Sequence, residues 1–108
     1  MEEKLFEPYI PEGKILKYLL KPLSRGDKSR FLASGGFSKL AVNELEDEIL
    51  RLGREGSATR VREHRFGKNV EIRGALKGPN GKELPVKTVW LVPKLRSPAR
   101  FVTLVPDV

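Results

Sequence analysis

Cysteine and glutamine are absent from this chain of 108 residues, and histidine, methionine and tryptophan each occur once. Without cysteine the protein can form no disulfide, no zinc–thiolate site and no thiol nucleophile. No apolar stretch approaches the roughly 18 residues that a membrane-spanning helix needs. The first residues lack the basic start and apolar run of a secretion signal, so we expect a cytoplasmic protein.

Several common site types are also missing from the sequence. A single histidine and the lack of an aspartate cluster argue against a metal site, and we expect no cofactor. The chain contains neither a G-x-x-x-x-G-K-[ST] phosphate loop nor a Gly-x-Ser-x-Gly nucleophile elbow. The sequence therefore gives no support for P-loop nucleotide binding or for serine-hydrolase chemistry.

Positive charge is what the chain has in excess, with a net charge of +7. Residues 1–56 carry ten basic and ten acidic side chains, whereas residues 57–108 carry eleven basic and four acidic ones. A polyanion is the natural partner for such a surface. An ordinary solvated surface has the same composition, so charge alone leaves both interpretations open.

Three helices are expected in the first half. Apolar spacing predicts one from Lys14 to Lys21, which Pro22 would end. Asp27 suits the N-cap of a short second helix that carries Phe31 and Leu32 and is closed by the Gly35-Gly36 pair.

A third helix is predicted from a capping-box pattern, with Asn43 as the N-cap and Glu46 three residues later. Gly53 and Gly56 would end it. After Gly56 the apolar period changes to two, which predicts four strands over residues 58–66, 69–77, 83–92 and 100–106.

The segment Gly78–Gly81 is a strong hairpin signal, because Pro79 suits a type I turn and Gly81 can adopt the left-handed conformation after it. A three-residue loop fixes the register of the flanking strands, since a slip by one residue would mix apolar and charged faces. The predicted pairs are Leu76–Leu84, Gly74–Val86, Ile72–Thr88 and Val70–Trp90 on one face, and Arg73–Lys87 and Glu71–Val89 on the other.

Gly67-Lys68 is predicted as a two-residue turn between the first two strands. It would place His64 opposite Glu71 and Arg62 opposite Arg73, with Val61 on the core face. We therefore expect a single α+β domain over residues 1–108, with two to three N-terminal helices packed on one face of a four-stranded antiparallel sheet. The helices should cover the face that bears Ile72, Val86 and Trp90. Trp90 and Phe101 are expected in the core rather than as base-stacking platforms.

The opposite face would gather Arg62, His64, Glu71, Arg73 and Lys87, which suits RNA cleavage without a metal. RNA supplies its own 2′-hydroxyl nucleophile, so the enzyme needs a base, an acid and cations around the phosphorane. His64 and Glu71 are the candidate acid–base pair, and Arg73 and Lys87 complete the candidate catalytic set, with Arg62 on the phosphate. A solvated sheet face with one salt bridge is the competing interpretation.

Lys28 and Arg30 lie in the first turn of the second predicted helix, where the dipole disfavours cations. Contact with an anionic ligand would explain the placement, and so would a solvated helix face.

A further set of motif residues is spread over the chain: Tyr18-Leu19-Leu20 with Pro22, Lys28, Phe31, Gly36-Phe37, Gly74, Leu76, Gly78-Pro79-Asn80-Gly81, Val86, Thr88-Val89-Trp90, Pro98, Arg100 and Val102-Thr103. In these residues the chain resembles a small uncharacterised bacterial and archaeal domain family that also occurs at the C-termini of polymorphic toxins.

The order of helices followed by four strands is similar to the barnase, EndoU, colicin and RelE-like ribonuclease superfamily. That resemblance implies RNA cleavage on the exposed sheet face and, for a stand-alone chain, an acidic antitoxin as partner. Lys28, Thr88, Arg100 and Thr103 match recurring polar positions of the family, which makes them RNA-binding candidates. His64 and Glu71 lie outside those positions, which favours catalysis by cations, as in RelE-like toxins.

Two hypotheses follow from the sequence. The first is a metal-independent endoribonuclease of the toxin–antitoxin or polymorphic-toxin type. The second is a non-catalytic module that binds RNA or a protein, for example as a toxin–antitoxin partner protein. In either case the exposed edge strands could pair with an antitoxin or with a second copy as a homodimer.

Overall fold

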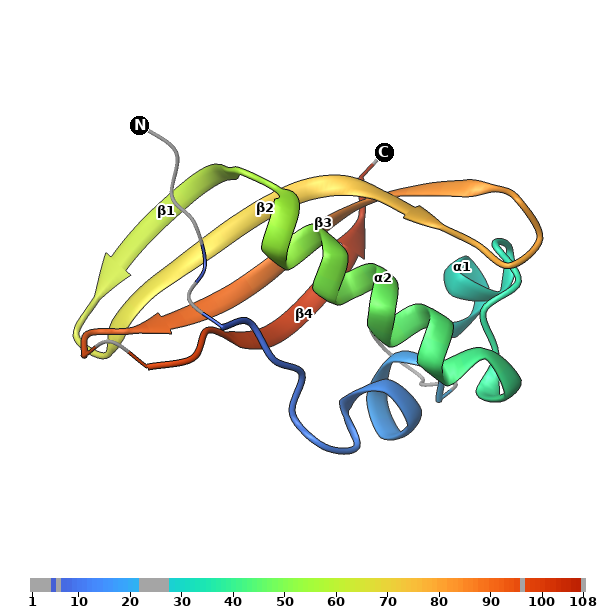
Figure 1. Cartoon of the computed structure of the whole chain (residues 1–108), viewed down its shortest axis with the longest axis horizontal. Helices are drawn as coiled ribbons and strands as arrows, with labels where there is room; N and C mark the ends of the chain where they lie inside the picture. The colour runs from blue at the N-terminus through green and yellow to red at the C-terminus, as the bar shows by residue number, and fades with distance from the viewer. Residues whose placement is uncertain (1–4, 6, 22–27, 96, 108) are drawn as a thin grey trace.

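The computed structural model describes residues 5, 7–21, 28–95 and 97–107, with helical elements first and strands second. The helical elements are the π-helical turn η1 (Ile15–Leu19), α1 (Ser29–Ala33), the 3₁₀ turn η2 (Lys39–Ala41) and α2 (Val42–Glu55). The strands are β1 (Ala58–His64), β2 (Gly67–Lys77), β3 (Glu83–Pro93) and β4 (Arg100–Pro106). They form one antiparallel sheet in the order β1-β2-β3-β4, with α2 laid across one face (Figure 1). The predicted α+β class is confirmed.

The core lies between α2 and the sheet. The buried stripe of α2 consists of Leu45, Ile49 and Leu52, at the spacing of one helix face. On the sheet, Ile72, Val86 and Trp90 are fully buried, so the face predicted to carry the helices does so. Each such side chain contributes about 1.5–3 kcal/mol by leaving water, which makes this contact the main source of stability. Within the described part of the chain, no helix is long and apolar enough to cross a membrane.

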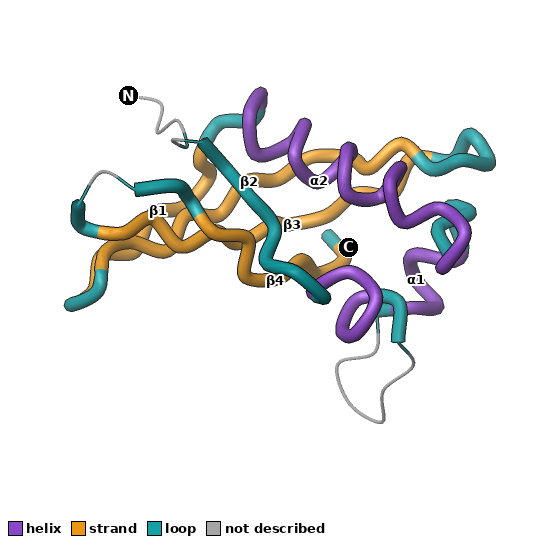
Figure 2. The backbone as a smooth tube through the Cα atoms, turned by 60° about the horizontal axis from the view of Figure 1, so that its bottom comes forward, coloured by secondary structure: helices purple, strands orange, loops and turns teal. Residues whose placement is uncertain are grey.

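The segment before η1 also packs onto the sheet. Tyr9 forms a short parallel bridge with β4, in which its N–H bonds Ala99 O and its carbonyl accepts from the Phe101 N–H, both at 2.9 Å. Leu5 and Ile10 pack against the core, and Figure 2 shows this segment running obliquely across the strands. The segment thus shields part of the β4 edge.

The β2–β3 hairpin has the predicted register, pair for pair, from Val70–Trp90 to Leu76–Leu84. Its loop is the predicted one: the Gly78 N–H donates to Lys82 O at 2.8 Å, and Gly81 has a φ of 89°. The tip then docks on the turn after α1, where Asn80 Nδ2 donates to Ser34 O at 3.0 Å. Turn chemistry and face alternation agree here, which is why the register could be predicted.

The β1–β2 register was predicted wrongly. The turn is formed by residues 65–66 rather than by Gly67-Lys68, so His64 pairs with Gly67, Arg62 with Asn69, and Arg60 with Glu71. Gly67 is a strand residue whose φ is 142°, and a Cβ on it would lie 2.1 Å from Val92 O. The glycine is required by this close approach to β3 rather than by a turn. Because the register error is an even number of residues, each side chain keeps its predicted face.

The helix ends also differ from the prediction. Asn43 lies inside α2, and the capping serine comes earlier: Ser38 Oγ accepts from the Leu40 N–H at 3.2 Å and starts η2. Gly53 does not end α2, which continues to Glu55. Gly53 instead faces Trp90, where a Cβ would lie 2.7 Å from the indole ring. The predicted roles of Pro22 and Asp27 concern residues outside the described ones.

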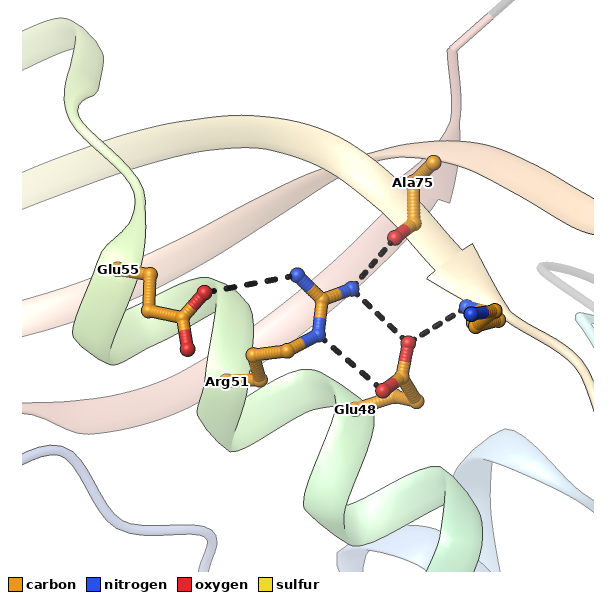
Figure 3. Close-up of polar contacts among 5 residues, drawn as sticks. Glu48, Arg51, Glu55 and Ala75 are labelled. Carbon is orange, nitrogen blue, oxygen red and sulfur yellow. Dashed lines mark hydrogen bonds and ion pairs between the residues drawn. The ribbon is translucent and has the colours of Figure 1, made fainter.

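An ion-pair cluster fixes α2 over the end of β2 (Figure 3). β1 pairs with β2 only as far as Ile72, so none of the described strands lies beside the following β2 backbone on that side. Arg51 Nη2 donates to Ala75 O at 2.9 Å, and the Lys77 N–H donates to Glu48 Oε1 at 2.6 Å. The Glu48 carboxylate also receives two hydrogen bonds from Arg51, which lower its pKa below the ordinary carboxyl value. Side chains of α2 thus satisfy the open edge of β2.

Candidate functional site

The sheet face turned away from α2, here called the outer face, carries most of the predicted site residues. By strand it consists of Arg60, Arg62 and His64 on β1; Asn69, Glu71 and Arg73 on β2; Lys87, Val89 and Leu91 on β3; and Thr103 and Val105 on β4. The side chains of Arg60, Arg62 and Arg73 are exposed, and α2 lies on the opposite side of the sheet (Figure 1). The outer face therefore presents a row of cations to solvent.

A hollow of about 170 Å³ lies on the outer face, lined by Arg60, Arg62, Asn69, Glu71 and Val89. Within the described part of the chain, the guanidinium groups of Arg60 and Arg62 form no ion pair or hydrogen bond. A planar guanidinium can bind a phosphate through two parallel hydrogen bonds. The two arginines flanking the hollow could therefore bind an anionic group such as a phosphate.

Glu71 is held in place beside these arginines. A β-bulge at Thr59 lets that residue donate to Glu71 Oε1 at 3.0 Å, while Arg73 Nε donates to the same oxygen at 3.3 Å. Partial burial raises the pKa of Glu71, but the bonds from Thr59 and Arg73 outweigh it and the net shift is downward. Asp107 Oδ1 lies 4.0 Å from Arg73 Nη1. Glu71 is therefore an ionised group that orients Arg73.

His64 and Glu71 are on the outer face, but the structure does not bring them together. Since His64 pairs with Gly67, Glu71 lies four residues further along β2, about 13 Å away at roughly 3.3 Å per residue. The Phe66 N–H donates to His64 Nδ1 at 3.1 Å, and Nε2 lies 3.2 Å from Asn69 Oδ1. Because a backbone N–H can only donate, Nδ1 is the unprotonated nitrogen in this arrangement. The predicted juxtaposition of the acid–base pair is therefore wrong.

His64 instead lines a second hollow of about 340 Å³ at the turn end of the sheet, together with Glu63, Gly67, Lys68, Pro93 and Lys94. The exposed ring of Phe66 lies close by, with ring centroids 6.2 Å apart. His64 thus belongs to the tip of the β1–β2 hairpin rather than to the row through Glu71.

Of the remaining predicted residues, some lie on the outer face and others lie on the helices or in the core. Arg73 and Lys87 pair across β2 and β3, as predicted, and Arg62 shares their face. Arg100 is exposed at the start of β4, opposite Leu91. Arg30 lies on the exposed side of α1, beside a hollow of about 350 Å³ whose lining includes no sheet residue.

Thr88 does not join the candidate site, which corrects its expected role as an RNA contact. It is fully buried on the core face, where its hydroxyl donates to Ile72 O at 2.8 Å and accepts from Trp90 Nε1 at 2.9 Å. These bonds satisfy two polar groups inside the core. Trp90 in turn packs edge-on against Phe101 at 5.4 Å, so both aromatic residues are core residues as predicted.

Lys28 and Thr103 meet around a residue that the sequence did not single out as functional, Tyr18. Lys28 Nζ donates to the Tyr18 hydroxyl at 3.0 Å, and this hydroxyl lies 3.5 Å from Thr103 Oγ1. Lys14 Nζ lies 4.4 Å from the centroid of the Tyr18 ring. We call these four residues the Tyr18 cluster. In the sequence Tyr18 stands out only as one of the family motif residues within the first predicted helix, and nothing there indicates a functional role for its hydroxyl.

Among the described residues, no three His, Asp or Glu side chains gather as metal ligands would. The charged groups of the outer face and of the Tyr18 cluster are mainly the guanidinium and ammonium groups of arginine and lysine. Such groups can bind phosphate and stabilise developing negative charge.

Comparisons with known proteins agree with this architecture. The fold is similar to that of a chain in a contact-dependent growth inhibition toxin–immunity protein complex from Klebsiella pneumoniae 342. The TM-score is 0.74 at 16% sequence identity, and 94% of each chain is covered. A search of curated proteins finds no match. Residues 4–107 match a family described as a domain of unknown function, DUF6883, and the chain therefore belongs to the DUF6883 family.

Proposed function

We propose that this protein is a toxin-type endoribonuclease that binds RNA on the outer face and cuts it without a metal ion. Two findings support the proposal. The outer face is cationic and uncovered by α2, and the fold is shared with a chain of a toxin–immunity complex. The architectural likeness to the barnase, EndoU, colicin and RelE-like ribonucleases is part of this proposal.

The pair of arginines at the outer-face hollow is the observation that carries the proposal. Arg60 and Arg62 border the same hollow, and their guanidinium groups are exposed. Two such groups can each clamp a phosphate, which fixes a phosphodiester chain across the strands. Arg73 and Lys87 extend the positive surface next to Glu71.

RNA chemistry suits a cationic site, because the nucleophile belongs to the substrate. Attack by the 2′-oxygen on phosphorus builds negative charge on the phosphorane, which nearby cations stabilise. We assign Arg62, Arg73 and Lys87 as phosphate ligands, together with Arg60, which borders the same hollow as Arg62. His64 lies at the turn end of β1, about 13 Å along the strands from Glu71 at roughly 3.3 Å per residue, so we place it at the margin of the bound RNA rather than at the scissile bond.

A binding function without catalysis is the second candidate. The toxin–immunity complex contains two kinds of protein, so the shared fold also suits an immunity-type or RNA-binding module. Among the residues that the structure describes, β1 has no strand neighbour on the side away from β2, and its residues are largely exposed. An acidic protein or a second copy of the chain could extend the sheet at this edge.

Incubation of the purified protein with bulk RNA in EDTA separates the two candidates. We expect cleavage that leaves 2′,3′-cyclic phosphate ends, and a loss of about tenfold or more with Arg62→Ala, since a charge-assisted phosphate contact is removed. Arg54→Ala removes the same charge from the exposed side of α2 and should cut normally. If the RNA stays intact while the protein is folded, the ribonuclease hypothesis is rejected and the hypothesis of a non-catalytic binding module remains.

A further inference from the structure

The Tyr18 cluster joins three parts of the chain at one edge of the sheet. Tyr18 lies on η1, Lys28 immediately precedes α1, and Thr103 lies on β4. Figure 1 shows η1 beside the β4 edge. The three side chains are therefore brought together by the tertiary fold, across 85 residues of sequence between Tyr18 and Thr103.

The cluster is in line with the hollow of the outer face. Arg60 pairs with Glu71, Glu71 with Val89, and Val89 with Thr103, which makes one row across all four strands. Neighbouring strands lie about 4.8 Å apart, so Thr103 is roughly 10 Å from Glu71 along this row. An RNA strand held by the arginines and laid across the sheet would reach Tyr18 at the β4 edge.

The electrostatic surroundings favour the phenolate form of Tyr18. The hydrogen bond from Lys28 and then the contact with Thr103 lower the pKa of Tyr18 below the ordinary value of 10.0, against a smaller opposing effect of burial. Lys14 and Lys28 both place their ammonium groups within 5 Å of the ring centroid, at 4.4 and 4.9 Å. Lys28 is only 9% exposed, so its charge acts at short range with little solvent screening.

We propose that Tyr18, held by Lys28 and Thr103, is the general base of RNA cleavage, and that the substrate is RNA with a free 2′-hydroxyl beside the scissile phosphate. This inference rests on the proposed ribonuclease function and assigns its proton transfer. Tyr18 is the catalytic residue, while Lys28 and Thr103 are positioning residues that act through it.

The step balances with water as the only co-reactant. The Tyr18 phenolate removes the proton of the 2′-hydroxyl, and the 2′-oxygen bonds to phosphorus while the bond from phosphorus to the 5′-oxygen breaks. The departing 5′-oxygen takes a proton from water. The resulting hydroxide takes the proton from Tyr18, which restores the phenolate and leaves a 2′,3′-cyclic phosphate and a 5′-hydroxyl.

The test measures cleavage and binding separately for Tyr18→Phe. We expect cleavage to fall about 100-fold or more, the scale of a lost general base. Binding of RNA that carries 2′-O-methyl groups, which cannot react, should stay within about twofold, because the arginine contacts remain. Tyr9→Phe, at an exposed tyrosine, is the matched control and should cut like the natural protein.

A second measurement does not depend on whether Tyr18→Phe folds. In the natural protein the cleavage rate should rise with pH as Tyr18 ionises, and Lys28→Met and Thr103→Val should move that rise to higher pH. Two results would reject Tyr18 as the general base without rejecting the ribonuclease function. One is cleavage by folded Tyr18→Phe within threefold of the natural rate, and the other is a pH profile of cleavage that does not move in Lys28→Met. A natural protein that never cuts RNA overturns the proposed function as well.

Discussion

The two faces of one sheet differ in charge and in burial, although the same strands form both. On the core face, Val70, Ile72 and Trp90 are fully buried and neutral. On the outer face, the residues between and beside them include Glu71 and Arg73, which are charged and reach solvent. Because side chains alternate along a strand, one short sequence specifies both a core and a charged surface.

A second contrast separates the outer face from the exposed side of α2. The helix exposes mainly acidic groups, namely Glu44, Glu46, Asp47 and Glu55. The outer face exposes arginines instead. A polyanion should therefore approach the molecule from the sheet side, with the acidic helix turned away. Substitutions separate these regions, and we expect the largest effect on stability in the core face.

Trp90→Ala breaks the core face and leaves the outer-face charges in place. Its ring packs on Phe101 and faces Gly53, and its N–H bonds Thr88, so we expect a loss of about 3–5 kcal/mol in the free energy of unfolding. Urea unfolding measures this loss. A change below about 1 kcal/mol would show that α2 and the sheet do not share a tight core.

Gly53→Ala tests a close approach between α2 and the sheet. Alanine favours helix, but its Cβ would lie 2.7 Å from the Trp90 ring, so we expect a net loss of about 1–3 kcal/mol in stability. The thermal stability of Gly53→Ala is compared with that of Arg54→Ala, a substitution at the neighbouring exposed residue. A more stable Gly53→Ala protein would contradict the packing described.

Glu48→Gln tests the ion-pair cluster that satisfies the edge of β2. At neutral pH we expect a loss of about 1–2 kcal/mol, since charge-assisted bonds to Arg51 and Lys77 are weakened. The pKa of Glu48 is lowered in the folded protein, so its contribution is complete above the ordinary carboxyl pKa and is lost as pH falls through the lowered value.

The difference between Glu48→Gln and the natural protein should therefore shrink in acid. Measuring the free energy of unfolding of both proteins from about pH 7 to pH 3 tests this. As a control, the exposed Glu46→Gln variant should differ from the natural protein by no more than about 0.5 kcal/mol throughout. A difference that stays constant over this range would mean that the carboxylate charge does not act on Arg51.

Much of the fold could be predicted, because local signals agreed with one another. In the β2–β3 hairpin, the Pro79–Gly81 loop and the face alternation pointed to the same register. Gly67 was predicted to form a turn, whereas the close approach to Val92 O that requires a glycine there exists only in the tertiary structure. The helical segment also begins earlier than predicted, because Ser38 caps η2, which leads directly into α2 and leaves Asn43 inside that helix.

The candidate site could be predicted only in part. Alternation placed Arg62, Arg73 and Lys87 on one face, and an even register error preserved that result. The distance between His64 and Glu71 depended on the register itself, so their pairing was predicted wrongly. The meeting of Tyr18 with Thr103 depends on how η1 packs beside β4, which no periodicity encodes.

The dependence of RNA affinity on salt tests most directly whether the outer face is the RNA-binding surface. Two double variants lose the same net charge: Arg60→Ala with Arg62→Ala on the outer face, and Lys39→Ala with Arg54→Ala on exposed helical positions. Binding of unreactive RNA is measured by fluorescence anisotropy over a salt series. The slope of log affinity against log salt should flatten by about 1–2 for the outer-face variant and stay unchanged for the helical one. Equal losses in both variants would show diffuse attraction to a basic protein and contradict an outer-face site.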